Sequence, residues 1–255
     1  MDVPDLHHIL GIDFGGSSFK AAIVDVTGGR LVSDVVRRES SLDTGPDEAV
    51  SAIAGMIREL EWHGPVGLGY PGVVKRGLCL SAANVSKQWL SVNAMELIRS
   101  IVQDRVAVIN DADAAGLAEL RFGAARSECG NDGGVVLMLT LGTGIGSAFF
   151  YRGRLFPNTE FGHIELLGDD AEKLAAASVR TRQHLDWPTW AARLNRYLEE
   201  IEKLVSPDLI VLGGGVSENF SSFRPYLNTR ARIECAALGN NAGILGAALA
   251  VDLPV

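Results

Sequence analysis

The sequence predicts an α/β fold with mixed sheets and flanking helices, because apolar strands alternate along the chain with helical segments. The longest apolar runs, VVLMLTLG and AGILGAALAV, fall well short of the roughly 20 residues that span a bilayer. The chain has 255 residues, of which 47% are hydrophobic and 21% charged. This length and composition are sufficient for one large domain or two small lobes.

The first part of the chain is expected to form a hairpin, a helix and further strands. Residues 46–62 carry apolar side chains at helical spacing behind Pro46, which predicts a helix. The other elements expected here are strands at 9–16 and 19–26 around a glycine turn, a strand at 31–36, a strand VGLGY, a hairpin over 71–80, a helix at 93–103 and a buried strand at 106–110.

The strand pattern restarts at 135–155 after a polar, glycine-containing loop. An apolar strand, a glycine turn, a second strand and a turn ending in GRL occur both at 9–31 and at 135–155, which indicates a diverged duplication or a coincidence of short hairpin patterns. A helix at 187–204, a strand at 208–212, a GGG turn with a helical stretch and a final helix at 241–251 complete the expected elements.

The stretch VINDADAAGLAEL places Asn110, Asp111 and Asp113 between a strand and a helix. Asn110 is a favourable N-cap, and Asp113 favours the helix dipole and can bond back to the cap. Asp111 is left without a role in this cap. A carboxylate at such a junction is either a further capping residue or a catalytic group, because α/β enzymes bind ligands at the C-terminal edge of the sheet.

Three glycine turns, DFGGSS, LGTGIGS and LGGGVS, each follow an apolar strand. Each is either a plain hairpin turn or a turn whose backbone N–H groups bind an anion. The middle turn lacks the helix of a dinucleotide-binding loop, and the chain contains no GxxxxGK[ST] motif. We therefore expect the turns to hold a phosphate. Asp13 either binds Mg²⁺ beside this phosphate or caps its turn. Lys20 either adds positive charge to the first turn or is a solvated side chain.

A polar cluster follows in PNTEFGHIEL, where Glu160, His163 and Glu165 lie within six residues. Together these side chains offer several hydrogen-bonding groups for a ligand rich in hydroxyls. Asn84 and Asn110 can add bidentate amide contacts. A hydroxyl-rich acceptor site combined with a phosphate site predicts a sugar kinase.

The motifs DFGGSSFK, YPG, NDADAAGLAE, LGTGIGS, NTEFGHIEL and LGGGVS occur in the order found in the ROK family of sugar kinases and repressors, which this chain resembles over nearly its whole length. The resemblance implies a two-lobed actin-like ATPase (ribonuclease H-like) fold with the active site in the interlobe cleft. The lobes are expected at 1–109 and 110–240, with a C-terminal helix at 241–255 packing back on the first lobe.

More narrowly, NDADAAG, PNTEFGH, WPTWAARLNRYL and NNAGILGAALA are similar to members of the family that phosphorylate glucose with inorganic polyphosphate. This resemblance implies that Asp111 is the catalytic base, which takes the proton of the 6-hydroxyl as glucose 6-phosphate forms. It implies sugar contacts by Asn84, Asn110, Glu160, His163 and Glu165. The expected donor-site residues are Gly15, Gly16, Ser17, Lys20, Thr143, Gly144, Gly214 and Gly215, and the expected metal ligand is Asp13, for Mg²⁺.

Many family members bind zinc through a CxCGxxGC loop, which this chain lacks, so we expect no zinc. His163 would then contact the sugar or order Glu160 without a metal. The three cysteines, Cys79, Cys129 and Cys235, are scattered and odd in number, which predicts buried small residues rather than a disulfide framework.

The donor is left open between polyphosphate and ATP, and a strictly ATP-dependent hexokinase is the main alternative. Residues 179–196 contain four arginines and one acid, which is typical either of a track for a polyanion or of a solvated helix face. A repressor would need a DNA-binding module before the first core strand near Ile9. A non-catalytic sugar-binding protein, a third alternative, would not need Asp111 or Asp13.

A formal net charge of −8 argues against nucleic acid or an anionic membrane as a partner. The first ten residues lack the pattern of a secretory signal, so we expect a cytoplasmic protein. A homodimer is expected, because dimers are the commonest closed assembly.

Overall fold

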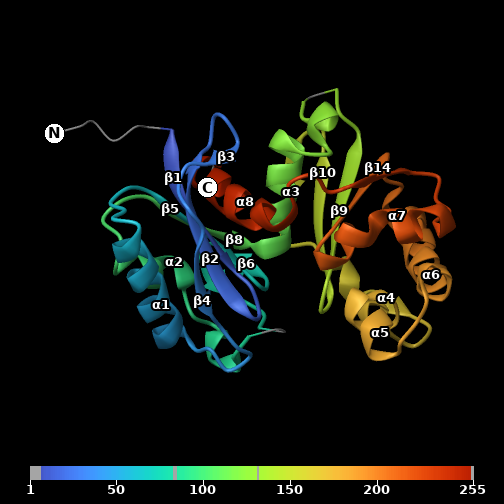
Figure 1. Ribbon diagram of the computed structural model, residues 1–255, viewed down its shortest axis with the longest axis horizontal. Helices are drawn as coiled ribbons and strands as arrows, with labels where there is room; N and C mark the ends of the chain where they lie inside the picture. The colour runs from blue at the N-terminus through green and yellow to red at the C-terminus, as the bar shows by residue number, and fades with distance from the viewer. Residues whose placement is uncertain (1–6, 83–84, 131, 254–255) are drawn as a thin grey trace. The chain divides into compact units, whose positions relative to one another are not determined.

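The structure is a computed structural model that describes residues 7–82, 85–130 and 132–253. The chain divides into two compact units, the first comprising Met1–Ala118 with Asn241–Val255 and the second comprising 119–240 (Figure 1). The sequence places the division before the helix α3 (Asp111–Phe122), whereas contacts in the structure assign the first part of this helix to the first unit. The chain therefore passes between the units within α3 and again just before Asn241.

The first unit is built on a six-stranded sheet in the order β3-β2-β1-β5-β8, with β4 also paired to β2. The strands are β1 (His8–Phe14), β2 (Ser18–Asp25), β3 (Arg30–Leu31), β4 (Val36–Glu39), β5 (Val66–Tyr70) and β8 (Val106–Asn110). β1 and β2 are antiparallel, whereas β1, β5 and β8 are parallel. The C-terminal ends of β1, β5 and β8 therefore meet at one edge, where α3 begins.

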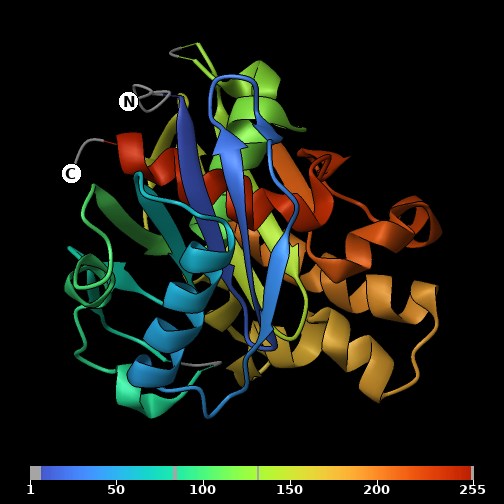
Figure 2. The same cartoon turned by 60° about the vertical axis from the view of Figure 1, so that its left-hand side comes forward.

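Helices cover both faces of this sheet (Figures 1 and 2). α1 (Pro46–Glu59) and α2 (Ala94–Arg99) lie on one face, and α8 (Ala242–Leu249) lies on the other, against β1 and β5. Gly11 of β1 allows this approach, because a Cβ at this position would collide with the carbonyl oxygen of Ile244. α8 is apolar nearly all round and most of its residues are buried, as expected of a helix that packs on a sheet.

The second unit is built on a five-stranded sheet in the order β11-β10-β9-β14-β15. Its strands are β9 (Val135–Leu141), β10 (Ile145–Tyr151), β11 (Arg154–Phe156), β14 (Leu209–Gly213) and β15 (Arg232–Cys235). β9, β10 and β11 are successively antiparallel, whereas β14 lies parallel to β9 and to β15. An antiparallel meander followed by two parallel strands is also the order of the first sheet, which supports the duplication rather than a coincidence of hairpins.

The helices of the second unit are α4 (Ala171–Ala175), α5 (Ala177–Arg182), α6 (Trp187–Val205) and α7 (Phe220–Phe223). α6 begins after Asp186, whose carboxylate accepts a hydrogen bond from the Thr189 N–H at 2.9 Å. Its buried side chains, among them Trp190 and Tyr197, pack on the core of this unit. Short hairpins are formed by β6 (Val74–Lys75) with β7 (Leu78–Cys79) and by β12 (Glu165–Leu166) with β13 (Asp169–Asp170).

The cysteine prediction is wrong in part. Cys79 is buried and Cys235 partly buried, but Cys129 is exposed, because it lies in the polar loop that precedes β9. All three are free thiols. Within the described ranges, no helix combines the length and apolar character needed to cross a bilayer.

Candidate functional site

The junction between β8 and α3 presents two polar residues in different roles. The side-chain oxygen of Asn110 accepts a hydrogen bond from the Asp113 N–H at 2.9 Å, and its Nδ2 donates to the Gly72 carbonyl at 3.1 Å. This confirms Asn110 as the cap of α3. Asp111 is the first helical residue, is partly exposed, and accepts a hydrogen bond from the Ala112 N–H at 2.8 Å. Its carboxylate is therefore not needed as the N-cap.

The first glycine turn joins β1 to β2. The Gly15 N–H donates to the Ser18 carbonyl at 3.0 Å. Ser40, which directly follows β4, supports the turn by donating its N–H to the Ser17 carbonyl and its hydroxyl to the Gly15 carbonyl. Gly16 and Ser17 are exposed, and their N–H groups have no acceptor in the part of the chain that the structure describes. These two amides are thus available to an anion.

Asp13 and Lys20 face each other beside this turn. The two residues are register partners on β1 and β2, and the lysine Nζ lies 3.4 Å from the carboxylate, with both side chains less than one fifth exposed. Burial raises the pKa of Asp13, and the Lys20 charge only partly counteracts that rise. Lys20 is therefore paired with Asp13 rather than freely solvated.

The second glycine turn joins β9 to β10 and is also supported by side groups of its own unit. The Gly142 N–H donates to the Gly144 carbonyl at 3.0 Å. Ser178 of α5 donates its hydroxyl to the Thr143 carbonyl at 2.6 Å and its N–H to the Gly142 carbonyl at 3.0 Å. No described residue accepts a hydrogen bond from the Thr143 or Gly144 N–H, so this turn also presents two amides.

The third turn follows β14 in the second unit. Gly214 adopts a φ of +79°, a conformation that favours glycine, and Gly215 is exposed beside it. Ser217 closes the turn by donating its N–H and its hydroxyl to the Gly214 carbonyl, at 3.0 and 2.7 Å. The three turns therefore share an exposed backbone at the end of a buried strand.

Glu160 precedes a short 3₁₀ turn (Phe161–His163), and His163 is the last residue of that turn. The His163 Nε2 is 3.9 Å from the Glu160 carboxylate, and its Nδ1 is 3.7 Å from that of Asp170. Burial raises the pKa of Glu160; the nearby His163 lowers it, and the Glu172 charge raises it further. Glu165, the third residue of the predicted cluster, is exposed on β12 with Asp170 as its register partner.

Ser147 of β10 fixes the backbone on both sides of Glu160. Its buried hydroxyl donates to the Thr159 carbonyl at 2.7 Å and accepts from the Phe161 N–H at 3.1 Å. The Thr159 hydroxyl returns a hydrogen bond to the Ser147 carbonyl at 3.1 Å. This clamp was not predicted from the sequence, although Ser147 lies in the motif LGTGIGS and Thr159 in PNTEFGHIEL.

Asn84, a predicted sugar contact, lies outside the described residues. In the described ranges, no group of three or more His, Cys, Asp or Glu side chains is arranged to hold a metal ion. Any metal held at Asp13 would therefore rely on other ligands for the rest of its coordination.

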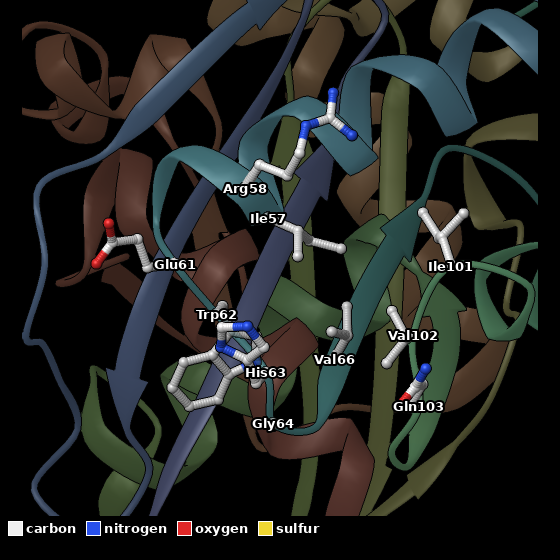
Figure 3. Close-up of a pocket in the computed structure, with 10 residues that line it drawn as sticks. All are labelled: Ile57, Arg58, Glu61, Trp62, His63, Gly64, Val66, Ile101, Val102 and Gln103. Atoms are coloured by element: carbon white, nitrogen blue, oxygen red, sulfur yellow. The ribbon is translucent and has the colours of Figure 1, made fainter.

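A separate cavity of about 680 Å³ lies in the first unit, between the end of α1 and the loop after α2 (Figure 3). Its apolar wall includes Ile57, Val66 and Ile101, and its polar groups include Arg58 and His63. None of its lining residues belongs to the predicted site, and Val66 is the first residue of β5, at the opposite end of that strand from the edge where α3 begins. The cavity therefore contributes nothing to the predicted chemistry.

Residues 9–174 match the ROK family. The chain belongs to the ROK family. The polyphosphate glucokinase of Mycobacterium tuberculosis (strain ATCC 25618 / H37Rv) is 44% identical over 244 residues, which cover 95% of this chain and 91% of that protein. This identity and coverage extend the ROK assignment to nearly the whole length of this protein.

Two solved structures resemble this ROK protein over most of its length. The inorganic polyphosphate/ATP-glucomannokinase from Arthrobacter sp. strain KM has a TM-score of 0.89 and 42% identity, covering 96% of this chain and 98% of that one. A ROK family glucokinase from Streptomyces griseus, in complex with glucose and AMPPNP, has a TM-score of 0.79 and 25% identity, covering 95% and 99%. These similarities confirm the actin-like ATPase fold predicted from the motifs.

Proposed function

We propose that this ROK protein is a kinase that transfers the terminal phosphoryl group of inorganic polyphosphate to the 6-hydroxyl of glucose. The observation that carries the proposal is the partly exposed Asp111 at the start of a helix already capped by Asn110, in a chain 44% identical to a polyphosphate glucokinase. The product would be glucose 6-phosphate, with the polymer one phosphate shorter.

In the proposed reaction, Asp111 accepts the proton of the glucose 6-hydroxyl. That oxygen forms a bond to the terminal phosphorus, and the bond from this phosphorus to the bridging oxygen of the polymer breaks. Removal of the proton by a positioned carboxylate typically contributes about 10²- to 10⁴-fold to the rate. Most of the remaining acceleration in phosphoryl transfer comes from positioning and charge neutralisation.

The donor phosphates would be bound by backbone amides, for which Gly16, Ser17, Thr143 and Gly144 offer N–H groups without another acceptor among the described residues. Gly15, Gly214 and Gly215 would complete the turns, and Lys20 would add charge. A kinase of this kind requires a divalent cation, and we propose Mg²⁺ with Asp13 as its protein ligand. When bound, Mg²⁺ neutralises phosphate charge. Because no described cluster of ligands surrounds Asp13, phosphate oxygens and water would fill the other positions.

The sugar would be held by Asn110, Glu160, His163 and Glu165, with Asn84 as a further contact. An amide side chain has two donors and two acceptor sites. Asn110 uses one of each with the residues that the structure describes, so among these one N–H and one acceptor site are left for hydroxyl groups. Glu160 and His163 are each more than one third exposed, and their segment is fixed by Ser147.

The polymer would run along the basic segment of α5 and α6. Arg182 and Arg196 are exposed there, whereas Arg180 stacks on the Trp187 ring at 3.5 Å and Arg193 donates to the Gln183 side chain at 2.8 Å. Exposed and pre-oriented guanidinium groups suit a chain of phosphates.

A second candidate function is an ATP-dependent hexokinase, which is favoured by the similarity to the AMPPNP-bound glucokinase.

The decisive assay supplies the pure protein with glucose, Mg²⁺ and either polyphosphate or ATP, and measures glucose 6-phosphate. Product with polyphosphate supports the proposal, whether or not ATP also serves. Product with ATP alone selects the second candidate. The absence of product with both donors would end the kinase proposal.

A further inference from the structure

Glu172 lies in the first turn of α4, immediately behind the second glycine turn. Its Oε2 accepts a hydrogen bond from the N–H of Ile145, the first residue of β10, at 3.2 Å. The start of α4 is itself fixed, because the Ala171 N–H donates to the Ile164 carbonyl at 3.0 Å. The carboxylate therefore reaches the turn from a helix whose position is set independently.

Gly144 shows how closely this carboxylate approaches the turn. A Cβ at position 144 would collide with the Oε2 of Glu172. On the other side, Ser178 of α5 holds the carbonyl groups of Gly142 and Thr143. Residues of two consecutive helices thus hold the turn: Glu172 of α4 accepts from one N–H group, and Ser178 of α5 donates to two carbonyl groups.

The hydrogen bond to Glu172 also determines which amides the turn can offer. The Ile145 N–H is taken by the carboxylate and the Gly142 N–H by the Gly144 carbonyl, which leaves the amides of Thr143 and Gly144. If Glu172 were absent, the Ile145 N–H would need another acceptor, and the turn could rotate to find one. Such a rotation would move the two amides that are available to an anion.

The peptide of Ile145 also contacts the segment that carries Glu160 and His163. Gly162, between them, lies so close that a Cβ there would collide with the Ile145 carbonyl oxygen. One residue therefore has its N–H bound by Glu172 and its carbonyl packed against Gly162. Ser147, two residues further along β10, holds the same segment.

We propose that Glu172 is a positioning residue for the phosphoryl donor: it binds the Ile145 N–H and so holds the Thr143 and Gly144 amides toward the donor phosphate. This inference rests on the proposed function, because it assumes that the turn binds phosphate. Glu172 does not touch the substrate in this account and acts only through the turn. Its role is that of a hydrogen-bond acceptor at a fixed reach, and its charge is not required.

Three variants separate reach from charge. Glu172→Gln keeps an acceptor at the same reach without the charge, Glu172→Asp keeps the charge but is one methylene shorter, and Glu172→Ala removes both. Glu199→Ala, an exposed position on α6 in the same unit, is the matched control. We expect the donor KM to rise at least about 10-fold in the Ala and Asp variants and to stay within about 3-fold in the Gln variant and the control. The glucose KM should stay within about 3-fold throughout.

An unchanged donor KM in a folded Glu172→Ala protein would overturn the proposal, as would Gln and Asp variants that lose donor affinity equally. A loss of kcat alone, without a change in the donor KM, would also contradict it. If Glu172→Ala does not fold, the comparison between the Gln and Asp variants decides.

Amide hydrogen exchange of residues 141–147 tests the hydrogen bond without relying on catalysis. Exchange should accelerate in Glu172→Ala and Glu172→Asp, but not in Glu172→Gln or Glu199→Ala. Should the wild-type protein phosphorylate glucose with neither donor, the proposed function fails, and this exchange pattern still decides whether Glu172 holds the turn. Equal exchange in all variants would show that it does not.

Discussion

The side-chain oxygen of Asn110 accepts a hydrogen bond from the Asp113 N–H at 2.9 Å. Helix capping and the proposed proton transfer are therefore assigned to different residues, although these residues are neighbours in the sequence. Because Asn110 provides the cap, the neighbouring Asp111 is not needed for it. The end of β8, the cap and the proposed catalytic carboxylate thus lie within two consecutive residues, Asn110 and Asp111. The bond fixes the helix whose first residue we propose as the catalytic base.

Replacing Asn110 with Ala should lower the free energy of unfolding by about 1 kcal/mol for the lost cap, and by about 1 kcal/mol or more for the lost donor to the buried Gly72 carbonyl. Asn110→Ser keeps a capping oxygen and should lose only the second contribution. Urea denaturation of both variants measures the difference. Equal stability of the Ser and Ala variants would show that the cap contributes little.

Asp13→Asn should make the protein more stable at neutral pH while impairing catalysis. The pKa of Asp13 is raised above its ordinary value of 3.8, mainly by burial. The folded protein therefore binds a proton at this carboxyl more tightly than the unfolded chain, and stability falls as pH rises through the folded pKa. The variant should melt higher at pH 7, by roughly 2–4 °C for each kcal/mol gained.

The same advantage should shrink as the pH falls toward 3.8 and disappear below it, where the wild-type carboxyl is protonated in both states. Melting temperatures of both proteins across this range, with Asp43→Asn as an exposed control, measure the trend. A variant that is less stable than the wild type at pH 7 would contradict the account of Asp13.

Glu119 should be among the most sensitive positions for stability in the second unit. Its fully buried carboxylate accepts hydrogen bonds from the N–H groups of Ala124, Ala237 and Leu238, at 2.8 to 3.1 Å. Glu119→Ala leaves three partly buried amides without this acceptor, so we expect a loss of about 1 kcal/mol for each hydrogen bond, or about 3 kcal/mol in all. Glu119→Gln should lose less, because it keeps one acceptor oxygen.

Urea unfolding, with Glu218→Ala as an exposed control, tests this order. A loss below about 1 kcal/mol in Glu119→Ala would show that water or other groups replace the carboxylate.

Arg182→Ala should weaken the use of polyphosphate but not of ATP. The side chain is exposed on α5 within the basic segment, so its contribution to a polyanion is electrostatic and screened by salt. We expect the KM for polyphosphate to rise about 3- to 10-fold at low salt, with a smaller effect at high salt. Arg154→Ala, an exposed arginine of β11, is the control. An equal effect on both donors would contradict the proposed track.

The local parts of the fold were predictable because their causes are local. The glycine turns after β1 and β9 follow apolar strands of seven residues, and the cap at Asn110 follows from its position between a strand and a helix. The order of the strands was not predictable, since β1 pairs with β5 across more than fifty residues of chain. The helix predicted at 93–103 is shorter in the structure, ending at Arg99.

Glu119 and Glu172, whose carboxylates hold backbone amides in place, were missed because these contacts join separate parts of the chain. In the sequence, both look like ordinary polar residues of helices. The N–H groups that donate to their carboxylates lie far along the chain or in a different element. In the structure each carboxylate lies against a glycine, Gly123 for Glu119 and Gly144 for Glu172, but Gly144 is far from Glu172 along the chain, so the sequence does not reveal that contact. Chemistry-bearing motifs are visible in one sequence, whereas the side chains that hold them in place become visible only with the fold.

The most direct test of the central claim is the turnover of Asp111→Asn, measured together with glucose binding and thermal stability. If Asp111 is the base, the variant folds and binds glucose like the wild type, but its kcat falls at least about 10²-fold with the preferred donor. A folded variant with wild-type turnover would remove Asp111 from that role and contradict the account.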